Sequence, residues 1–482
     1  MNHATLEQKL TTLKEFKTLR PETVDKVGQL IRELDDWSLF RMNPVAWAGQ
    51  YGFDAQELLD VFIHAAKLGL LDFNYNMICP QCGGVEYSHN SMNDVEKEKF
   101  FCVVCNVEVP SQLDDQVEVS FTLNSAIRAL NLDPFKDPDH YRRYYFSANF
   151  RRSQQLTDYV QSSIRAFQTV SPDRSESFRL EVAPGELYRV ISPDQHSAVF
   201  VHGAKPGEDS QQNAEIDVVR GGFSPRGVVV TPGVATISVR NLTKQRVSYM
   251  VVRTEFDQLH KIITAHPSHC APFVTGKALL NTQSFRDLFR IQELDRNLRL
   301  SLRSLTILFT DLKGSTELYD RTGDIVAYGF VQDHFQVLTQ AVRENRGAII
   351  KTMGDAIMAT FSTPQDGVKA AVAMMSRMEA INQRVSQMGY ETGLKIGLHE
   401  GPALAVNSDD RLDYFGQTVN VAARVQGLAA AGEIWVTTPV FSASGVPAMV
   451  HDAGYHERRQ SVSLKGVGAA AEVYRLTHGA QA

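Results

Sequence analysis

The sequence lacks several features that would each place it in a particular class of protein. No apolar run approaches the roughly 20 residues that a membrane-spanning helix needs, and the polar start MNHATLEQKLTTLKEFK has no apolar core of a signal peptide. Five cysteines in 482 residues do not build a disulfide framework. The formal net charge of -6 argues against a surface that is basic throughout. We therefore expect a cytoplasmic protein with no membrane segment, and we disfavour nucleic acid as its partner.

The composition is that of an ordinary globular protein, with 43% hydrophobic and 22% charged residues. At about 150 residues per domain, the length predicts a multidomain chain of about three domains. The expected fold class is an N-terminal helical region with a zinc ribbon, a middle β-rich sandwich and a C-terminal α/β domain (an α+β sandwich). The expected boundaries are 1–75 helical, with a winged-helix-like unit as one interpretation; 76–115 zinc ribbon; 116–174 mostly helical connector; 175–255 β-sandwich-like domain; 256–303 linker and signalling helix; and 304–478 α/β domain.

Four of the five cysteines form two pairs, Cys79-x2-Cys82 and Cys102-x2-Cys105, with 19 residues between the pairs. This spacing is typical of a zinc ribbon with four thiolate ligands. We expect one structural Zn²⁺ per chain, held by Cys79, Cys82, Cys102 and Cys105. A redox switch stays open as the alternative, because Cys-x-x-Cys pairs also cycle as disulfides.

The middle of the chain is a series of short β-branched or aromatic runs from Phe178–Val182 to Val247–Val252, separated by Pro-Gly turns. Strands at this density predict a β-sandwich or barrel. Two roles stay open for it, a structural or dimerising module and a sensor of an unknown regulatory ligand. The following stretch, 281–302, is predicted to be a helix that either relays a signal or packs as a linker.

From Ser304 onward the sequence alternates between strand and helix patterns, which predicts an α/β sandwich. The expected strands are 305–309, 348–361 (two strands around a Gly-Asp turn), 394–397, 434–437 and 472–476, and the expected helices are 324–345, 366–385 and 419–428.

Two acidic residues lie at strand ends in this region. Asp311 ends an apolar strand, and Asp355 lies at a strand-turn-strand corner. Carboxylates at neighbouring strand ends are suited to a two-metal phosphoryl-transfer site with Mg²⁺. The turn Gly314-Ser-Thr316 offers backbone N–H groups for phosphates. Asn420 and Arg424 are four apart on a predicted helix and therefore project from one face.

Three motifs in this order and spacing resemble the class III adenylyl/guanylyl cyclase family: Phe-Thr-Asp-Leu-x-Gly-Ser-Thr, Lys-Thr-x-Gly-Asp and Asp-x-Phe-Gly-x-x-Val-Asn-x-Ala-x-Arg. The resemblance covers about residues 300–478. It implies a homodimer with active sites shared between two chains. In each site, two Mg²⁺ (or Mn²⁺) would be held by one chain, while residues of the other bind the base and orient the ribose and phosphates. The residues it implicates are Asp311 and Asp355 for the metals, Asn420 and Arg424 for catalysis, and Lys351, Asp413, Leu312, Gly314, Thr316 and Lys465 for substrate.

The substrate follows from the two base-reading residues. Adenine has an acceptor at N1 and a donor at its 6-amino group, which match a Lys donor and an Asp acceptor, whereas guanine has the opposite polarity. Lys351 and Asp413 therefore favour ATP, and the expected activity is adenylate cyclase. Two alternatives stay open: a guanylyl cyclase, and a DNA-binding or signalling regulator that uses the cyclase-like domain as a nucleotide sensor.

Overall fold

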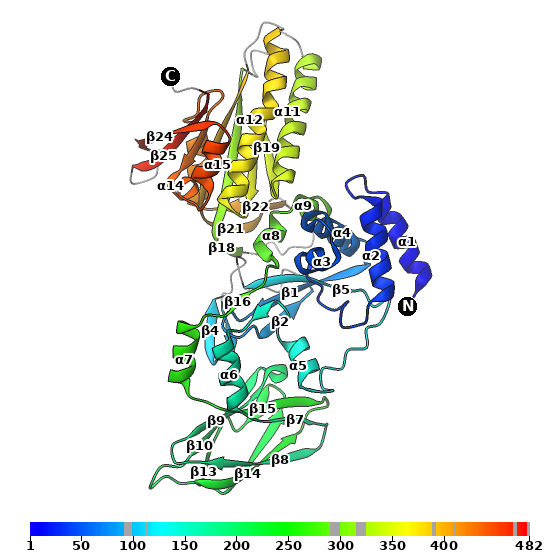
Figure 1. Cartoon of the computed structure of the whole chain (residues 1–482), viewed down its shortest axis with the longest axis vertical. Coiled ribbons are helices and arrows are strands. Elements are labelled where there is room, and N and C mark those ends of the chain that lie inside the picture. The colour runs from blue at the N-terminus through cyan, green and yellow to red at the C-terminus, as the bar shows by residue number, and fades with distance from the viewer. Residues whose placement is uncertain are drawn as a thin grey trace.

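The computed structural model describes residues 1–90, 99–110, 114, 116–289, 299–314, 324–387, 392–408, 411–465 and 470–479. The chain forms an elongated molecule, with the C-terminal domain at one end, a β-sandwich at the other and the N-terminal helices beside the middle (Figure 1). None of the helices that the structure describes combines the length and hydropathy of a membrane span.

Helices dominate the first 67 residues, and their starts follow from capping residues. Asn2 and Asp54 accept hydrogen bonds from the backbone N–H groups of Thr5 and Glu57, which satisfies otherwise unpaired donors in the first turn. Proline occupies the first turn of two others, where no N–H is needed. The helices are α1 (His3–Lys14), α2 (Pro21–Glu33), α3 (Pro44–Tyr51) and α4 (Ala55–Lys67).

A four-stranded sheet follows, in the order β17-β5-β1-β2. Its strands are β1 (Leu71–Ile78), β2 (Val85–His89), β5 (Val117–Leu123) and β17 (Val274–Thr275). The cysteine hairpin β3 (Lys99–Cys102) and β4 (Val107–Pro110) lies between β2 and β5 in the chain. Because β17 pairs with β5 but comes after the β-sandwich in the chain, the sandwich is an insertion in this N-terminal unit.

The structure corrects two of the expected segments. Residues 116–174 are not mostly helical: they contain β5, β6 (Phe150–Arg151) and the start of the sandwich, with only α5 (Pro138–Tyr145) and α6 (Gln154–Ser163) as helices. Residues 256–303 are not a simple linker, because α7 (Phe256–Ala265), β16 (His269–Cys270), β17, α8 (Gly276–Leu280) and α9 (Gln283–Leu288) belong to the N-terminal unit.

The helix expected over 281–302 is also wrong at its end. A strand, β18, begins at Arg299 instead, and Leu300 pairs there with Ala405. The apolar residues in this stretch therefore belong to two elements, the helix α9 and the strand β18, and do not form one amphipathic face. The part of the expected helix at 290–298 lies outside the described residues.

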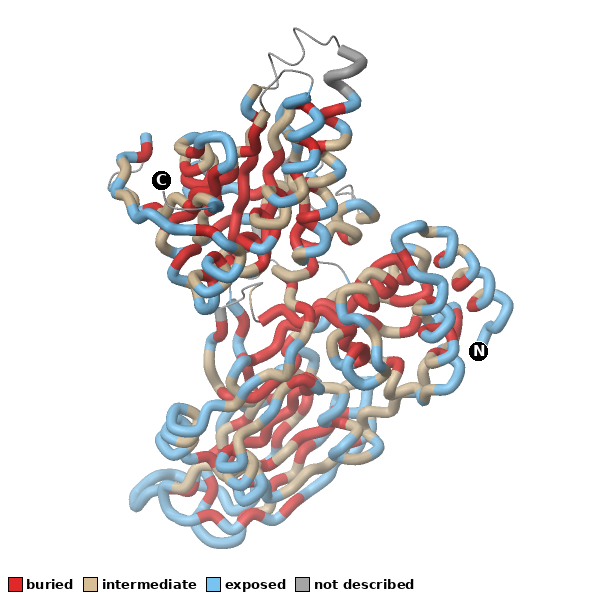
Figure 2. The backbone as a smooth tube through the Cα atoms, turned by 45° about the horizontal axis from the view of Figure 1, so that its top comes forward, coloured by how far each residue is buried: buried red, intermediate tan, exposed pale blue. Residues whose placement is uncertain are grey.

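The β-sandwich consists of two sheets, β13-β10-β9-β15-β7 and β12-β11-β14-β8. Buried and exposed residues alternate along its strands, because side chains point to opposite faces of a sheet (Figure 2). Valine and isoleucine from both sheets share one core. The strands are β7 (Ile164–Val170), β8 (Ser175–Val182), β9 (Leu187–Ser192), β10 (Ser197–Gly203), β11 (Asn213–Val219), β12 (Gly222–Ser224), β13 (Gly227–Val230), β14 (Gly233–Asn241) and β15 (Val247–Arg253).

The C-terminal domain is built on an eight-stranded sheet, in the order β19-β20-β18-β21-β23-β25-β24, with β22 beside β21. Its strands are β18 (Arg299–Lys313), β19 (Gly347–Met353), β20 (Ala356–Phe361), β21 (Gly393–Ser408), β22 (Arg411–Phe415), β23 (Ile434–Thr437), β24 (Tyr455–Val462) and β25 (Ala471–His478). Its helices are α11 (Asp324–Glu344), α12 (Pro364–Gln387), α13 (Gln417–Gln426), α14 (Thr438–Phe441) and α15 (Val446–Asp452).

The two faces of this sheet belong to different cores. On β18, Leu308 and Leu312 point into the core shared with α11, α12 and α15, whereas Ile307 and Phe309 point into the core shared with α13 and the N-terminal unit. Asp311 has the same parity along the strand as Ile307 and Phe309, and therefore lies on the second face.

Helix α13 lies unusually close to β21 on that second face. A Cβ atom added at Gly397 would lie 2.1 Å from the backbone nitrogen of Gln426, and one at Gly401 would lie 2.7 Å from Thr418 Oγ1. Glycines four residues apart share one face of a strand, so these positions leave room for the helix backbone. The position of α13 therefore depends on the absence of side chains at these glycines.

We predict that Gly397→Ala destabilises the domain by about 2 kcal/mol, because the new methyl group meets backbone that has no room to yield. Thermal unfolding of the purified variant measures the loss. Gly329→Ala is the matched control, since no atom lies within 4 Å of the added Cβ in helix α11. Equal stability of the two variants would contradict the close packing of α13.

Candidate active site

The two predicted metal-binding carboxylates lie on neighbouring elements of the sheet. Phe309 pairs with Met358, and the Ile357 N–H donates to Thr310 Oγ1 at 3.0 Å. The same register places Asp311, at the end of β18, next to the β19–β20 turn that carries Asp355. Asp355 Oδ2 is buried and has no hydrogen-bond partner within the described structure. Such an oxygen is costly without a cation or donor, so the pair fits a divalent metal site.

A buried histidine supports the turn that carries Asp355. His334, on α11, donates from Nε2 to the backbone oxygen of Asp355 at 3.0 Å, while its Nδ1 faces the sulfur of Met378 at 3.4 Å. Burial lowers the pKa of His334, which keeps the imidazole neutral. The histidine therefore acts as a neutral donor that fixes the position of the turn.

The structure adds a residue that the sequence patterns did not identify. Lys395 lies directly opposite Asp311 in the β18–β21 register, and its Nζ is 2.8 Å from Asp311 Oδ2. No local motif singles out this lysine, and only the pairing of two strands 84 residues apart shows its place. It puts a positive group beside one of the predicted metal-binding carboxylates.

The predicted base-reading residues form an ion pair. Lys351, on the edge strand β19, places Nζ 2.7 Å from Asp413 Oδ2 on β22. The other oxygen of the carboxylate, Asp413 Oδ1, accepts a hydrogen bond from the Tyr414 N–H at 2.8 Å. A donor and an acceptor are thus held side by side in a partly exposed position.

The remaining predicted residues are placed in different ways. Asn420 is exposed and Arg424 is half-buried on α13, next to the buried stripe of Val421 and Val425. Gly314 follows β18 in a turn with a φ of 86°, a conformation that favours glycine. The side chain of Leu312 is buried in the helix-covered core, so only its backbone is available to a ligand. Lys465 is exposed in the turn after β24, and Thr316 lies outside the described residues.

Three large apolar side chains are exposed on the strands β19, β21 and β22, which carry or adjoin the Lys351–Asp413 pair. Phe415 is 69% exposed, and Leu404, its partner in the β21–β22 register, is 37% exposed. Met353 is exposed next to the β19–β20 turn. Apolar groups gathered beside a polar site are typical of a protein interface.

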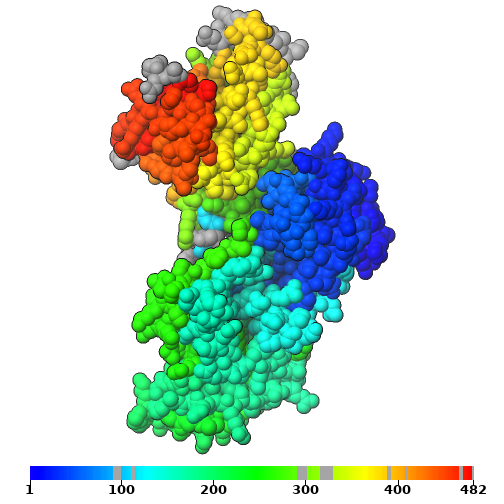
Figure 3. All heavy atoms as spheres, viewed as in Figure 1, coloured from blue at the N-terminus to red at the C-terminus, as the bar shows by residue number. Residues whose placement is uncertain are grey.

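Helices α8 and α9 join the N-terminal unit to this face. Arg286, which is half-buried, donates to the backbone oxygen of Leu412 and lies 5.8 Å from the centre of the Tyr414 ring. Asn281 Oδ1 accepts from Thr360 Oγ1 at 2.6 Å, and Gln283 Oε1 accepts from the Ile349 N–H at 2.7 Å. In the space-filling view, the blue N-terminal helices lie directly against the C-terminal domain (Figure 3). The neighbours of Asp413 are thus held by the N-terminal unit.

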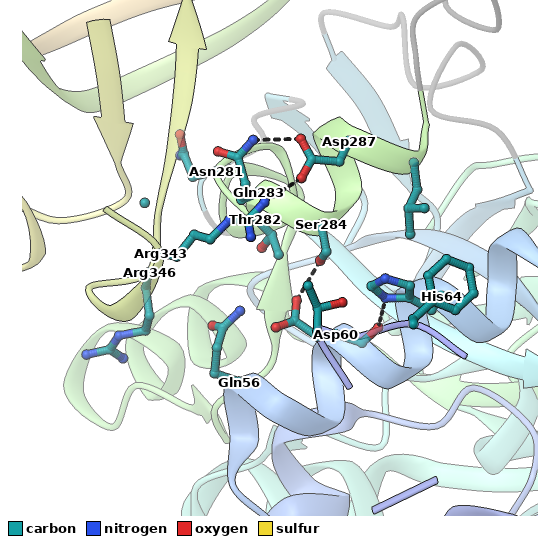
Figure 4. A pocket seen from close by; sticks show the side chains of 14 residues that line it. Gln56, Asp60, His64, Asn281, Thr282, Gln283, Ser284, Asp287, Arg343 and Arg346 are labelled. Atoms are coloured by element: carbon teal, nitrogen blue, oxygen red, sulfur yellow. Dashed lines mark hydrogen bonds and ion pairs between the residues drawn. The ribbon is translucent and has the colours of Figure 1, made fainter. Parts of the chain in front are cut away.

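A polar pocket of about 380 Å³ opens at this junction. Asp60 on α4 accepts a hydrogen bond from Ser284 Oγ at 2.5 Å, and burial raises the pKa of Asp60. Across the pocket, Arg343 forms a 2.7 Å ion pair with Asp287 (Figure 4). The pocket is therefore lined by ionisable groups from both units.

The four paired cysteines form one compact group. Their sulfur atoms lie within 4.8 Å of one another and are buried, with separations of 3.9 Å for Cys79–Cys105 and 3.6 Å for Cys82–Cys102. A tetrahedral shell with zinc–sulfur bonds of about 2.3 Å has sulfur–sulfur separations of about 3.8 Å. The group therefore fits a closed four-thiolate metal site.

Comparison with known families gives two matches along the chain. Residues 3–287 match a family of unknown function, DUF5939, and because this match covers more than half of the sequence, the chain belongs to that family. Residues 300–478 match the adenylate and guanylate cyclase catalytic domain. The C-terminal domain is therefore a class III nucleotide cyclase domain.

Individual relatives match within the same region. An adenylate cyclase of Anabaena cylindrica is 34% identical over 139 residues, which are 27% of this chain and 28% of that protein. Adenylate cyclase 1 of Rhizobium meliloti is 26% identical over 186 residues, 36% of this chain and 27% of that protein. The chain thus spans little more than a quarter of these curated relatives. The crystal structure of the adenylyl cyclase CyaB from P. aeruginosa has a TM-score of 0.33 and 22% identity, covering 38% of this chain and 97% of that one.

Proposed function

We propose that the chain is an adenylyl cyclase that converts ATP to 3′,5′-cyclic AMP and pyrophosphate. The observation that carries this proposal is the 2.7 Å pair between Lys351 and Asp413. Lys351 would donate to adenine N1, and Asp413 would accept from the 6-amino group. The backbone bond from Tyr414 leaves the Asp413 carboxylate oriented for that role. Guanine, with its reversed polarity, would place a donor against Lys351 and an acceptor against Asp413, which argues against GTP.

The proposed reaction is intramolecular. The ribose 3′-oxygen attacks the α-phosphorus in line, its proton passes to solvent, and the bond from the α-phosphorus to the bridging oxygen breaks to release pyrophosphate. Two Mg²⁺ or Mn²⁺ ions, bound by Asp311 and Asp355, would supply positive charge for the attacking oxygen and the phosphates.

The side chains around the metals then position the substrate. Asn420 would orient the ribose, and Arg424 would stabilise the charge that develops on the α-phosphate. Lys395, beside Asp311, is placed to attract the phosphate chain once the metals occupy the carboxylates. Lys465 is a further phosphate contact in this proposal, and the turn at Gly314 offers backbone N–H groups.

We further propose that two copies of the chain share each site. The exposed side chains of Met353, Leu404 and Phe415 flank the base-reading pair and would be buried between the copies. A two-fold axis then makes two equal sites, each with the acidic pair of one copy and the Lys351, Asp413, Asn420 and Arg424 set of the other.

We predict that Asp355→Asn and Asn420→Ala chains are each inactive alone, with rates at least about 100-fold below wild type. Co-expressed, they should recover about a quarter of the wild-type rate, because half of randomly mixed dimers are hetero-dimers and each of those has one intact site of two. Cyclic AMP formation by the purified mixture measures this.

Glu379→Gln, at an exposed carboxylate on α12, is the control for charge removal and should keep full activity. Mixed dimers that form, as tagged purification detects, yet stay inactive would contradict sites shared between two copies.

We propose that the four-cysteine group holds one structural Zn²⁺ per chain. The ion would link the Cys79–Cys82 turn to the Cys102–Cys105 hairpin, two segments that are separated by 19 residues in the sequence. A closed shell of four thiolates has no open position for substrate, so its role would be structural.

We predict about one zinc per chain in metal analysis of the purified protein. Cys102→Ser should lose most of the zinc and unfold at a lower temperature, because the thiolates left behind are buried and mutually repelling. Cys270→Ser, which changes the one cysteine outside the group, should keep both properties. A folded wild-type protein without metal, or with disulfides in this group, would contradict the zinc site.

A further inference from the structure

A second pocket, which we call the α6–α7 cavity, lies between the cysteine group, helices α5, α6 and α7, and the β7, β9 and β15 strands of the sandwich. Its volume is about 330 Å³, within the roughly 300–1,000 Å³ range of small-molecule sites. Most of its walls are apolar. The main apolar side chains are Leu156, Val160, Phe167, Met250, Leu259 and Ile263.

Helix α7 covers the cavity, and side chains do not fill the space beneath the helix. It packs beside α6 (Figure 1), and Leu259, Ile262 and Ile263 recur along it at helical spacing. Yet none of its ten residues is buried. A surface helix normally buries its apolar stripe in a core. Here, part of that stripe faces an open apolar space, which a ligand would complete.

Arginine side chains give the cavity a polar end. Arg189 is only 3% exposed; its Nε donates to Thr254 Oγ1 at 3.1 Å and its Nη1 to Val103 O at 3.5 Å. Arg152 lies with its guanidinium 5.5 Å from the centre of the Phe146 ring. Neither has a carboxylate partner in the described part of the chain. Burial lowers the pKa of both, so each is a cation held at a cost that an anion would offset.

The cysteine group offsets part of this charge. A zinc ion with four thiolates carries a net charge of about −2, and Cys82 and Cys105 also line the cavity. The arginines therefore have a second role as counter-ions. However, a guanidinium has five N–H donors, and Arg189 uses two of its nitrogens on Thr254 and Val103. Donors remain for an acceptor at the cavity's polar end.

We propose that the α6–α7 cavity binds a small amphiphilic carboxylate. Its apolar body lies between α6, α7 and the sandwich sheet, and its carboxylate accepts hydrogen bonds from Arg152 and Arg189. Such a ligand contacts the cysteine group, the sandwich and α7 at once. Because α7 leads through β16 and β17 into α8 and α9, the site is joined by a short stretch of chain to the helices that hold the cyclase domain.

The test is calorimetric titration of the full-length, metal-loaded chain with decanoate, and with 1-decanol as the uncharged match. Wild type should bind decanoate saturably and about tenfold more tightly than decanol, the size of one charge-assisted hydrogen bond. Arg152→Gln should remove this preference while keeping the affinity for decanol. Equal binding of the two compounds by wild type, or no saturable binding of decanoate, would overturn the proposal.

Variants that fill the cavity locate the site. Leu259→Trp should weaken decanoate binding at least about tenfold, because the indole occupies the ligand's space. His260→Trp, at the next and exposed position of α7, should bind as wild type does. If Leu259→Trp fails to fold, Val160→Trp fills the cavity from α6. Unchanged binding in the folded filling variant would overturn the assignment to this cavity.

Discussion

The structure of the C-terminal domain depends on a sheet whose two faces have different roles. One face is closed by α11, α12 and α15 and forms an ordinary apolar core. The other must hold Asp311, Lys395 and α13, and it also packs against the N-terminal unit. Because side chains alternate along a strand, one residue of slip in β18 would bury Asp311 and expose leucines. The same strand register that stabilises the core therefore fixes the position of Asp311.

Sharing that face ties the N-terminal unit to the proposed base-reading pair. Arg286 contacts the backbone of Leu412 and the ring of Tyr414, the residues on either side of Asp413. Gln283 holds the backbone at Ile349, two residues before Lys351. A movement of α8 and α9 would therefore displace backbone next to both Lys351 and Asp413. This arrangement gives the DUF5939 region a direct physical route to the cyclase domain without a separate signalling helix.

Some of this structure could be predicted from sequence, and the rest could not, for physical reasons. Helix periods in the C-terminal domain marked its main helices because each has one apolar face, as for α12, whereas the strand β23 was marked by a short run of residues that are buried on both faces. The cysteine spacing marked a group that the fold does bring together. Lys395 was missed because its role depends on pairing with a distant strand. The helix expected at 281–302 was wrong at its end, where β18 begins, because apolar periodicity in a short stretch does not separate a helix end from a strand start.

The most direct test is the rate of cyclic nucleotide formation by the purified full-length chain, with ATP or GTP as substrate and Mg²⁺ or Mn²⁺ as the metal. We predict cyclic AMP from ATP, strictly dependent on the metal, and at least about tenfold less product from GTP, since guanine would place a donor against Lys351 and an acceptor against Asp413. Cyclic GMP as the main product would contradict the proposed recognition of adenine by Lys351 and Asp413. No product from either nucleotide would contradict catalysis and favour a nucleotide-sensing role.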